Sequence, residues 1–175
     1  MQVSTQGPTL RALLVVGALC AVLSAAGCAS KGDADFGATY DPITEFPATA
    51  SWVWDDSAVR LPDDDRLDSA AIDKDIKAAV GSEFGARGYT EAPSGNVQYL
   101  LSYELAVYTW LSQTEARAFG TLSVLMSEAA TGRRVWLGFL RLQIDHSLTP
   151  EKREARLRES VAGMLENFPP GQPGK

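Results

Sequence analysis

The alternation of side chains between residues 97 and 107 is the feature that most constrains the fold. Every second residue in this stretch is apolar, namely Val97, Tyr99, Leu101, Tyr103, Leu105 and Val107. Successive side chains of a strand point to opposite faces, so this pattern predicts a long, half-buried β-strand. Such a strand requires partner strands and a layer that covers its apolar face.

Two more alternating stretches follow and supply those partners. Phe119 to Met126 aligns Leu122, Val124 and Met126, and residues 134 to 144 alternate again after a turn at Ala130-Thr131-Gly132-Arg133. Gly132 is placed to take the positive φ that such a turn requires. We expect three strands in an antiparallel meander, and a further short strand at Ala50-Ser51-Trp52-Val53-Trp54.

Two amphipathic helices are predicted, one before this meander in the sequence and one after it. Residues 68 to 87 form the first, with an apolar stripe every fourth residue at Ile72, Ile76, Val80 and Phe84. Thr149-Pro150 begins the second as a cap and first helical residue, and its stripe contains Leu157, Val161, Met164, Leu165 and Phe168. The expected fold is α+β: a twisted antiparallel sheet of about four strands or more, with both helices packed on one face.

The first 27 residues have the layout of an export signal. Arg11 precedes an apolar run that ends in Ala25-Ala26-Gly27 and is too short to span a bilayer as a helix. The cysteine that follows, Cys28, resembles the acceptor of a bacterial lipobox, so we expect cleavage before Cys28 and lipidation of its sulfur. Acyl chains such as palmitate would then anchor the chain stably. The alternative is an ordinary signal peptide that happens to contain a cysteine.

These features predict four parts of the chain. They are a lipoprotein signal peptide (1–27), a lipidated flexible tether (28–36), a single periplasmic α+β domain (37–170) and a frayed tail (171–175). Within the domain, residues 36–47 and 55–66 read as irregular segments, because prolines and aspartates interrupt them. Ala29 is not aspartate, and resemblance to other Gram-negative lipoproteins then implies the periplasmic face of the outer membrane.

Charge and cysteine content narrow the classes of partner. The chain has 22 acidic and 16 basic residues, which argues against binding nucleic acid or anionic lipid by charge. Its two cysteines, Cys20 and Cys28, would leave with the signal and carry the lipid, so we expect no disulfide. The expected partners are the membrane, through the lipid, and an unknown envelope protein.

Several short motifs together resemble a known family. They include Tyr40-Asp41-Pro42, Ala50-Ser51-Trp52-Val53-Trp54, the Ala86-Arg87-Gly88-Tyr89 helix end, the hairpin around Thr131-Gly132-Arg133, and Asn167-Phe168-Pro169-Pro170. Their order resembles the bacterial domain-of-unknown-function family 4136. That resemblance implies a secreted lipoprotein with an α+β domain, similar in outline to domains that help to assemble envelope machinery. It supplies no catalytic residues.

No reaction is legible in the residues. His146 is the only histidine, and no nucleophile, phosphate-binding loop or metal motif accompanies it. The aspartates at 63–65 lack the spacing of a calcium loop and are interpreted as a solvated segment before a helix. We therefore expect a protein that is not an enzyme and has no cofactor or metal.

The far end of the long strand provides the candidate contact site. Tyr108, Trp110 and Leu111 lie beside a polar turn, where they either cap the core or form an exposed anchor for a partner. Glu104, Arg117 and Arg141 are charges within strands, which matter only if they converge on a groove. Trp52, Trp54 and Trp136 are expected to pack in the core or at its edge.

Three functions remain open at this level. The first is a non-enzymatic envelope module that binds or assembles with another component, with the tether raising its local concentration. The second is a carrier of a small apolar molecule in a pocket between sheet and helices. The third, and least favoured, is a hydrolase that uses carboxylates.

Overall fold

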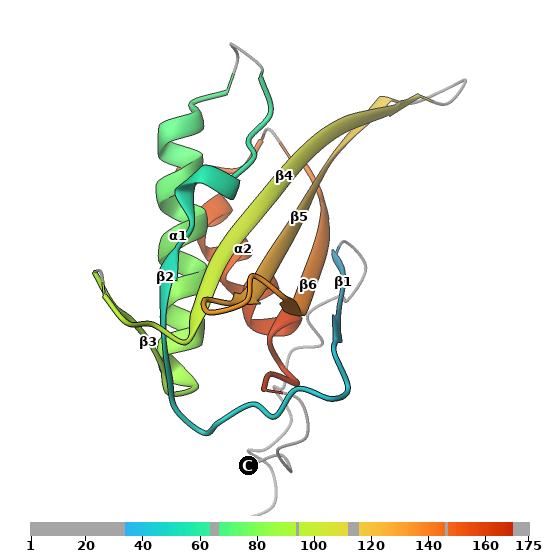
Figure 1. Ribbon diagram of the computed structural model, residues 1–175. Helices are drawn as coiled ribbons and strands as arrows, with labels where there is room; N and C mark the ends of the chain where they lie inside the picture. The colour runs from blue at the N-terminus through green and yellow to red at the C-terminus, as the bar shows by residue number, and fades with distance from the viewer. Residues whose placement is uncertain (1–33, 64–66, 94, 112–115, 146, 170–175) are drawn as a thin grey trace, which may run out of the picture. The chain divides into compact units, whose positions relative to one another are not determined.

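The computed structural model describes residues 34–63, 67–93, 95–111, 116–145 and 147–169. They form one mixed sheet whose strand order is β1-β6-β5-β4-β2-β3, with two helices, so the α+β class is confirmed. Figure 1 shows α1 and α2 side by side on one face of the sheet. Neither helix of the described residues covers the opposite face.

The three-stranded meander is present as predicted. It consists of β4 (Tyr99–Leu111), β5 (Ala116–Glu128) and β6 (Arg134–Gln143), all antiparallel. Gly132 takes a φ of 70° in the turn between β5 and β6, as its position in the sequence predicted. The strand predicted at 50–54 is β2 (Ala50–Trp54).

The sheet is not wholly antiparallel, which corrects one part of the prediction. Strand β2 runs parallel to both of its neighbours, β4 and the short β3 (Tyr89–Glu91). Helix α1 (Ser69–Ala86) lies between β2 and β3 in the chain and returns it to the starting edge of β2. A strand that follows such a crossover pairs in parallel, so this topology follows from the position of the helix.

The segment predicted to be irregular before residue 47 contains an edge strand. Strand β1 (Ala34–Tyr40) pairs antiparallel with β6, from Ala34 opposite Leu142 to Tyr40 opposite Trp136. Residues 34–36, which the sequence assigned to the flexible tether, belong to the sheet. The predicted loop at 55–66 also contains a 3-10 turn, η1 (Asp56–Ala58), and an isolated bridge from Arg60 to Glu104.

Both helices begin with a side-chain cap, and that of α2 is the one predicted from the sequence. The Asp68 side chain accepts a hydrogen bond from the Ala71 amide, 3.0 Å away, at the start of α1. Thr149 accepts one from the Lys152 amide at the start of α2 (Pro150–Met164), with Pro150 as the first helical residue. These side chains satisfy amides that would otherwise lack a partner.

The core is an aromatic cluster centred on Phe84 of α1. Its ring packs against four others, with centroid distances of 4.9 Å to Phe168, 5.9 Å to Trp136, 6.1 Å to Trp52 and 6.2 Å to Tyr89. Phe168 lies beyond α2 and adds Phe46 at 5.8 Å. Edge-to-face packing of this kind joins both helices to strands from each half of the sheet.

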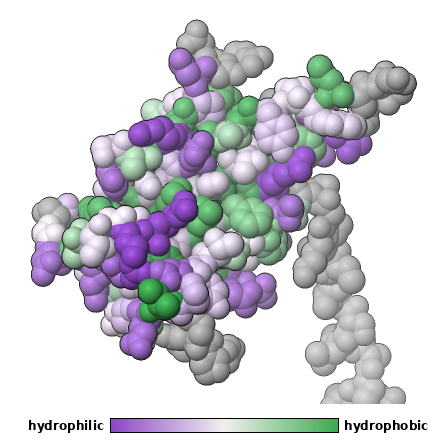
Figure 2. All heavy atoms as spheres, turned by 45° about the vertical axis from the view of Figure 1, so that its right-hand side comes forward, coloured by the Kyte–Doolittle hydropathy of each residue, from purple (hydrophilic) through white to green (hydrophobic). Residues whose placement is uncertain are grey.

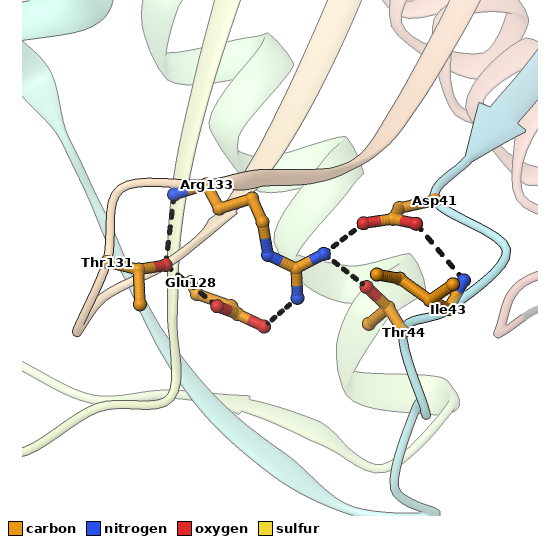
Figure 3. A network of polar contacts seen from close by, with 6 residues as sticks. All are labelled: Asp41, Ile43, Thr44, Glu128, Thr131 and Arg133. Carbon is orange, nitrogen blue, oxygen red and sulfur yellow. Dashed lines mark hydrogen bonds and ion pairs between the residues drawn. The ribbon is translucent and has the colours of Figure 1, made fainter.

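An ion-pair network fixes the segment after β1 to the β5–β6 turn (Figure 3). The Arg133 guanidinium contacts the carboxylates of Asp41 and Glu128 and donates to the Thr44 hydroxyl, 3.2 Å away. The Thr131 hydroxyl donates to Glu128, 2.7 Å away. This hydroxyl and the Arg133 guanidinium hold the pKa of Glu128 below its ordinary value of 4.5.

Acid should remove the contribution of this ion-pair network to the stability of the fold. A carboxyl group whose pKa is lower in the folded state stabilises the fold above its ordinary pKa, and loses that effect as the pH falls through the lowered value. We expect a higher melting temperature for the wild type than for Glu128→Gln at pH 7, with a difference that begins to shrink near pH 4.5 and disappears below the lowered pKa of Glu128. Thermal melts from pH 7 to pH 3 test this, with Glu159→Gln on the exposed side of α2 as the control. A difference that stays constant across the range would contradict it.

Candidate interaction surface

Strands β4 and β5 extend beyond the body of the domain. We call residues 105–111 of β4, with the paired residues 116–122 of β5, the arm. Figure 1 shows the arm projecting past the helices and the other strands, toward a tip drawn in grey. Burial falls along β4, because Tyr99, Leu101 and Tyr103 are buried under the helices while every residue from Ala106 to Leu111 is exposed.

All three residues predicted as a contact site lie on the arm and are exposed. The exposed fractions are 39% for Tyr108, 53% for Trp110 and 73% for Leu111. They do not cap the core, which was the alternative interpretation. Val107, with 37% exposed, belongs with them and was assigned from the sequence to the buried face. Figure 2 shows hydrophobic surface at the end of the arm, next to the grey atoms.

The strand register divides these side chains between the two faces of the arm. Tyr108 lies opposite Phe119 and Trp110 opposite Arg117, on the side that carries no helix. Val107 and Leu111 alternate with them and therefore lie on the other side. The arm therefore exposes apolar side chains on both of its faces. A strand that packs on a core exposes only one face.

A cation stacks on the base of the arm. The rings of Tyr108 and Phe119 are stacked with centroids 5.7 Å apart, and the Arg141 guanidinium lies 4.5 Å from the Phe119 ring and 5.4 Å from that of Tyr108. Such contacts orient aromatic rings at modest energetic gain. The sequence offered no signal for this stack, because it depends on the register between three strands.

The arm also has an open backbone edge. The Leu105 amide donates to the Arg60 carbonyl, and the Arg60 amide donates to the Tyr103 carbonyl. The backbone amides and carbonyls of the odd-numbered residues of β4 therefore point away from β5. Beyond Leu105, β5 is the sole strand paired with β4 among the described residues. The amides and carbonyls of Val107, Thr109 and Leu111 therefore face outward.

The charged residues within the strands do not form a polar pocket. Glu104, Arg117 and Arg141 are exposed on the helix-free face, where Arg141 takes part in the stack described above. A cavity of about 170 Å³ lies elsewhere, between β1 and the end of α2, and none of the three residues lines it. Its walls include Phe36, Trp136, Met164 and Glu166.

Several sequence candidates fall outside the described residues. These are Cys28, His146, two of the three aspartates at 63–65, and the predicted signal peptide and tail. Within the part of the chain that the structure describes, no group of three His, Cys, Asp or Glu side chains is placed to hold a metal ion. No helix in that part is long and apolar enough to cross a membrane.

Comparison with protein families identifies the domain. A family model described as "Domain of unknown function (DUF4136)" matches residues 37–170. The chain belongs to this family. The match begins within β1 and covers the other strands and both helices, so the arm lies within the DUF4136 domain and is no appendage to it. No curated protein matches the chain significantly.

Solved structures resemble the DUF4136 domain at low sequence identity. A dodecamer of PelC from Paraburkholderia phytofirmans has a TM-score of 0.52 and 14% identity, over 79% of this chain and 99% of that one. A PDZ domain protein from Parabacteroides distasonis scores 0.54 with 10% identity, over 82% of this chain and 38% of that one. Lipoprotein GNA1162 from Neisseria meningitidis scores 0.46, with 10% identity over 67% and 99%. At these identities the first two likenesses show the fold alone.

Proposed function

We propose that this protein is a lipid-anchored envelope lipoprotein whose domain faces the periplasm and acts as a non-enzymatic binding or assembly module. The observation that carries the proposal is the arm, a projecting pair of strands on which Val107, Tyr108, Trp110 and Leu111 are exposed together. Exposed aromatic groups are the side chains that contribute most to protein interfaces. Clusters of them on a soluble surface mark sites of interaction.

The likeness to PelC supports an assembly role. That protein is described as a dodecamer, so a domain of this fold serves there as a subunit. The arm offers this chain a contact of its own, built from side chains and an open strand edge. The proposed anchor would hold it near the membrane, since only residues 29–33 separate Cys28 from β1 and even fully extended they span about 17 Å.

Lipidation of Cys28 is tested by metabolic labelling with an alkynyl palmitate analogue. We expect the wild-type chain to incorporate the label and to sediment with outer membranes, and Cys28→Ser to lose both properties. Cys20→Ser is the matched control, because that residue lies upstream of the predicted cleavage site and should label normally. Labelled Cys28→Ser protein would contradict the anchor, and label only in inner membranes would contradict the proposed location.

The contact role of the arm is tested by a photocrosslinking residue at Trp110 in the full chain. We expect a defined protein adduct from this position and none from Ile43, which is more exposed but lies away from the arm. Adducts of equal yield at both positions would indicate random collision and would contradict a role for the arm.

A small apolar ligand is the second candidate, favoured by the cavity beside β1. Its wall is partly aromatic, through Phe36 and Trp136, and it lies between a strand and a helix as expected for such a pocket. Its volume of about 170 Å³ is below the range of about 300–1,000 Å³ that is typical of small-molecule sites. Lipid that copurifies with the wild type but not with Ala38→Leu, which adds bulk at the cavity wall, would establish this function instead.

A further inference from the structure

The open edge of the arm lacks the features that normally prevent strands from pairing. Its sequence from Leu105 to Leu111 contains no charge, proline or glycine. The pairing of β4 with β5 runs without a register shift from Tyr99 to Leu111, so no bulge turns the edge away. Natural sheets protect exposed edges with these devices, because unpaired amides and carbonyls are a template for another strand.

The other two edges of the sheet are less suited to pairing. Strand β3 has only three residues and includes Glu91. Strand β1 carries Asp35 and Gly37, and glycine weakens a strand because it adds no side chain to the pairing. The distal half of β4 is therefore the edge at which a new strand would meet the least opposition.

We propose that this edge pairs antiparallel with the same edge of a second copy of the chain, about a two-fold axis at Tyr108. The inference rests on the proposed assembly role and names the partner. The backbone amides and carbonyls of the odd-numbered residues face outward, so these residues must form the hydrogen-bonded pairs, and this requirement fixes the register. Val107 then pairs with Thr109 of the second copy, and Leu105 faces Leu111 of the second copy.

In this register the hydrogen bonds between the two copies form without breaking any hydrogen bond within either chain. Val107 and Thr109 of each copy exchange amide and carbonyl bonds with their opposites. The Leu111 amide donates to the Leu105 carbonyl of the other copy, while the Leu105 amide keeps its bond to Arg60. The Arg60 bridge thus marks where the covered part of the β4 edge ends and the free part begins.

The side chains in this register are complementary. Tyr108 meets Tyr108 of the second copy, which extends the stack with Phe119 into a row of four rings across the joined sheets. Trp110 lies opposite the small Ala106, so a large group faces a small one at each end of the row. No charged residue lies within the paired segment, so like charges do not oppose each other there despite a net charge of −6 per chain.

Symmetry and anchoring both favour a second copy over an unrelated strand. A two-fold contact uses the same patch on both subunits, and this segment is complementary to itself. Two copies anchored in one membrane also meet at a raised effective concentration, so a contact of seven residues can suffice.

Disulfide formation in membranes tests the register directly. Across the axis, Tyr108→Cys would place its Cα about 4.5 Å from that of the second copy, in a non-hydrogen-bonded pair that a disulfide can bridge. Ala106→Cys lies on the same face, but its mate would be about 14 Å away. We expect mild oxidation of intact membranes to convert Tyr108→Cys, and not Ala106→Cys, to a reducible dimer of the chain.

Edge-blocking variants test the backbone pairing. The Thr109 amide faces outward, so Thr109→Pro removes a donor from the open edge and none from the β4–β5 ladder. We expect Thr109→Pro in the Tyr108→Cys background to abolish the dimer and Thr109→Val to retain it. We also expect Trp110→Ala to weaken self-association of the detergent-solubilised chain about 30-fold or more, measured by sedimentation.

The outcomes separate this inference from the proposed function. Equal crosslinking of Tyr108→Cys and Ala106→Cys, or a Tyr108→Cys dimer that survives Thr109→Pro, would overturn the two-fold pairing. Trp110 adducts to a different protein, with no adduct to the chain itself, would overturn self-pairing and leave the assembly role intact. Loss of every Trp110 adduct, with Cys28 unlabelled, would remove the proposed function as well.

Discussion

Replacing Phe84 by alanine should lower the free energy of unfolding by about 3–5 kcal/mol, the range for removing a buried aromatic ring. The Phe84 side chain is fully buried, and its ring contacts those of Trp52, Tyr89, Trp136 and Phe168. Alanine would leave a cavity that these large, mutually packed rings cannot collapse to fill. This loss is a large fraction of the stability of an ordinary domain, which is about 5–15 kcal/mol.

Urea unfolding of the purified chain, followed by tryptophan fluorescence, measures the effect. The matched control is Phe139→Ala, because the Phe139 ring lies on the helix-free face with 36% of its surface exposed. We expect that control to lose less than half as much stability. Phe84→Leu should also lose less than Phe84→Ala, since leucine refills most of the volume. Equal losses for Phe84→Ala and Phe139→Ala would show that the cluster is not the core that holds the domain together.

Elements with strong local signals were predictable from the sequence. The stripe of α1 and the Thr149-Pro150 start of α2 depend on residues within one helix, and both are confirmed. Strand β1 was missed because its stability comes from elsewhere in the chain. The Phe139 ring of β6 lies where a Cβ of Gly37 would be, and the Phe36 ring packs closely on Gly163 of α2. These contacts compensate for a glycine that reads locally as a strand breaker.

The arm shows where prediction of the site stops. The residues Tyr108, Trp110 and Leu111 could be named, because aromatic side chains at the end of a strand are visible in the sequence. Their exposure could not be predicted from the sequence, because the alternating pattern of apolar residues in β4 is the same in the half that the helices cover and in the half that is exposed. The helices and the Arg60 bridge determine where cover ends, and both are contacts between distant segments. The parallel pairing of β2 was missed for the same reason.

Gly138→Ala should be the most disruptive change of a single methyl group. Gly138 lies on the core face of β6, and the Trp136 indole from two residues earlier crosses directly over it. A Cβ at this position would overlap that ring, with Cζ2 only 2.7 Å away and the Met164 sulfur 2.9 Å away. Trp136 is itself held by Phe84 and Phe168, so the indole cannot move aside without displacing the cluster.

We therefore expect Gly138→Ala to lose about 1–3 kcal/mol, or more, through overpacking. The control is Gly85→Ala in α1, where an added Cβ meets nothing within 4 Å and alanine is the better helix former. That control should leave the urea midpoint unchanged or raise it slightly. Met164→Ala should partly rescue Gly138→Ala, because it removes one of the two obstructing groups, whereas it should only destabilise the wild type. Additive losses in the double variant would mean that the sulfur does not restrict the ring, and the packing of α2 on β6 would need another explanation.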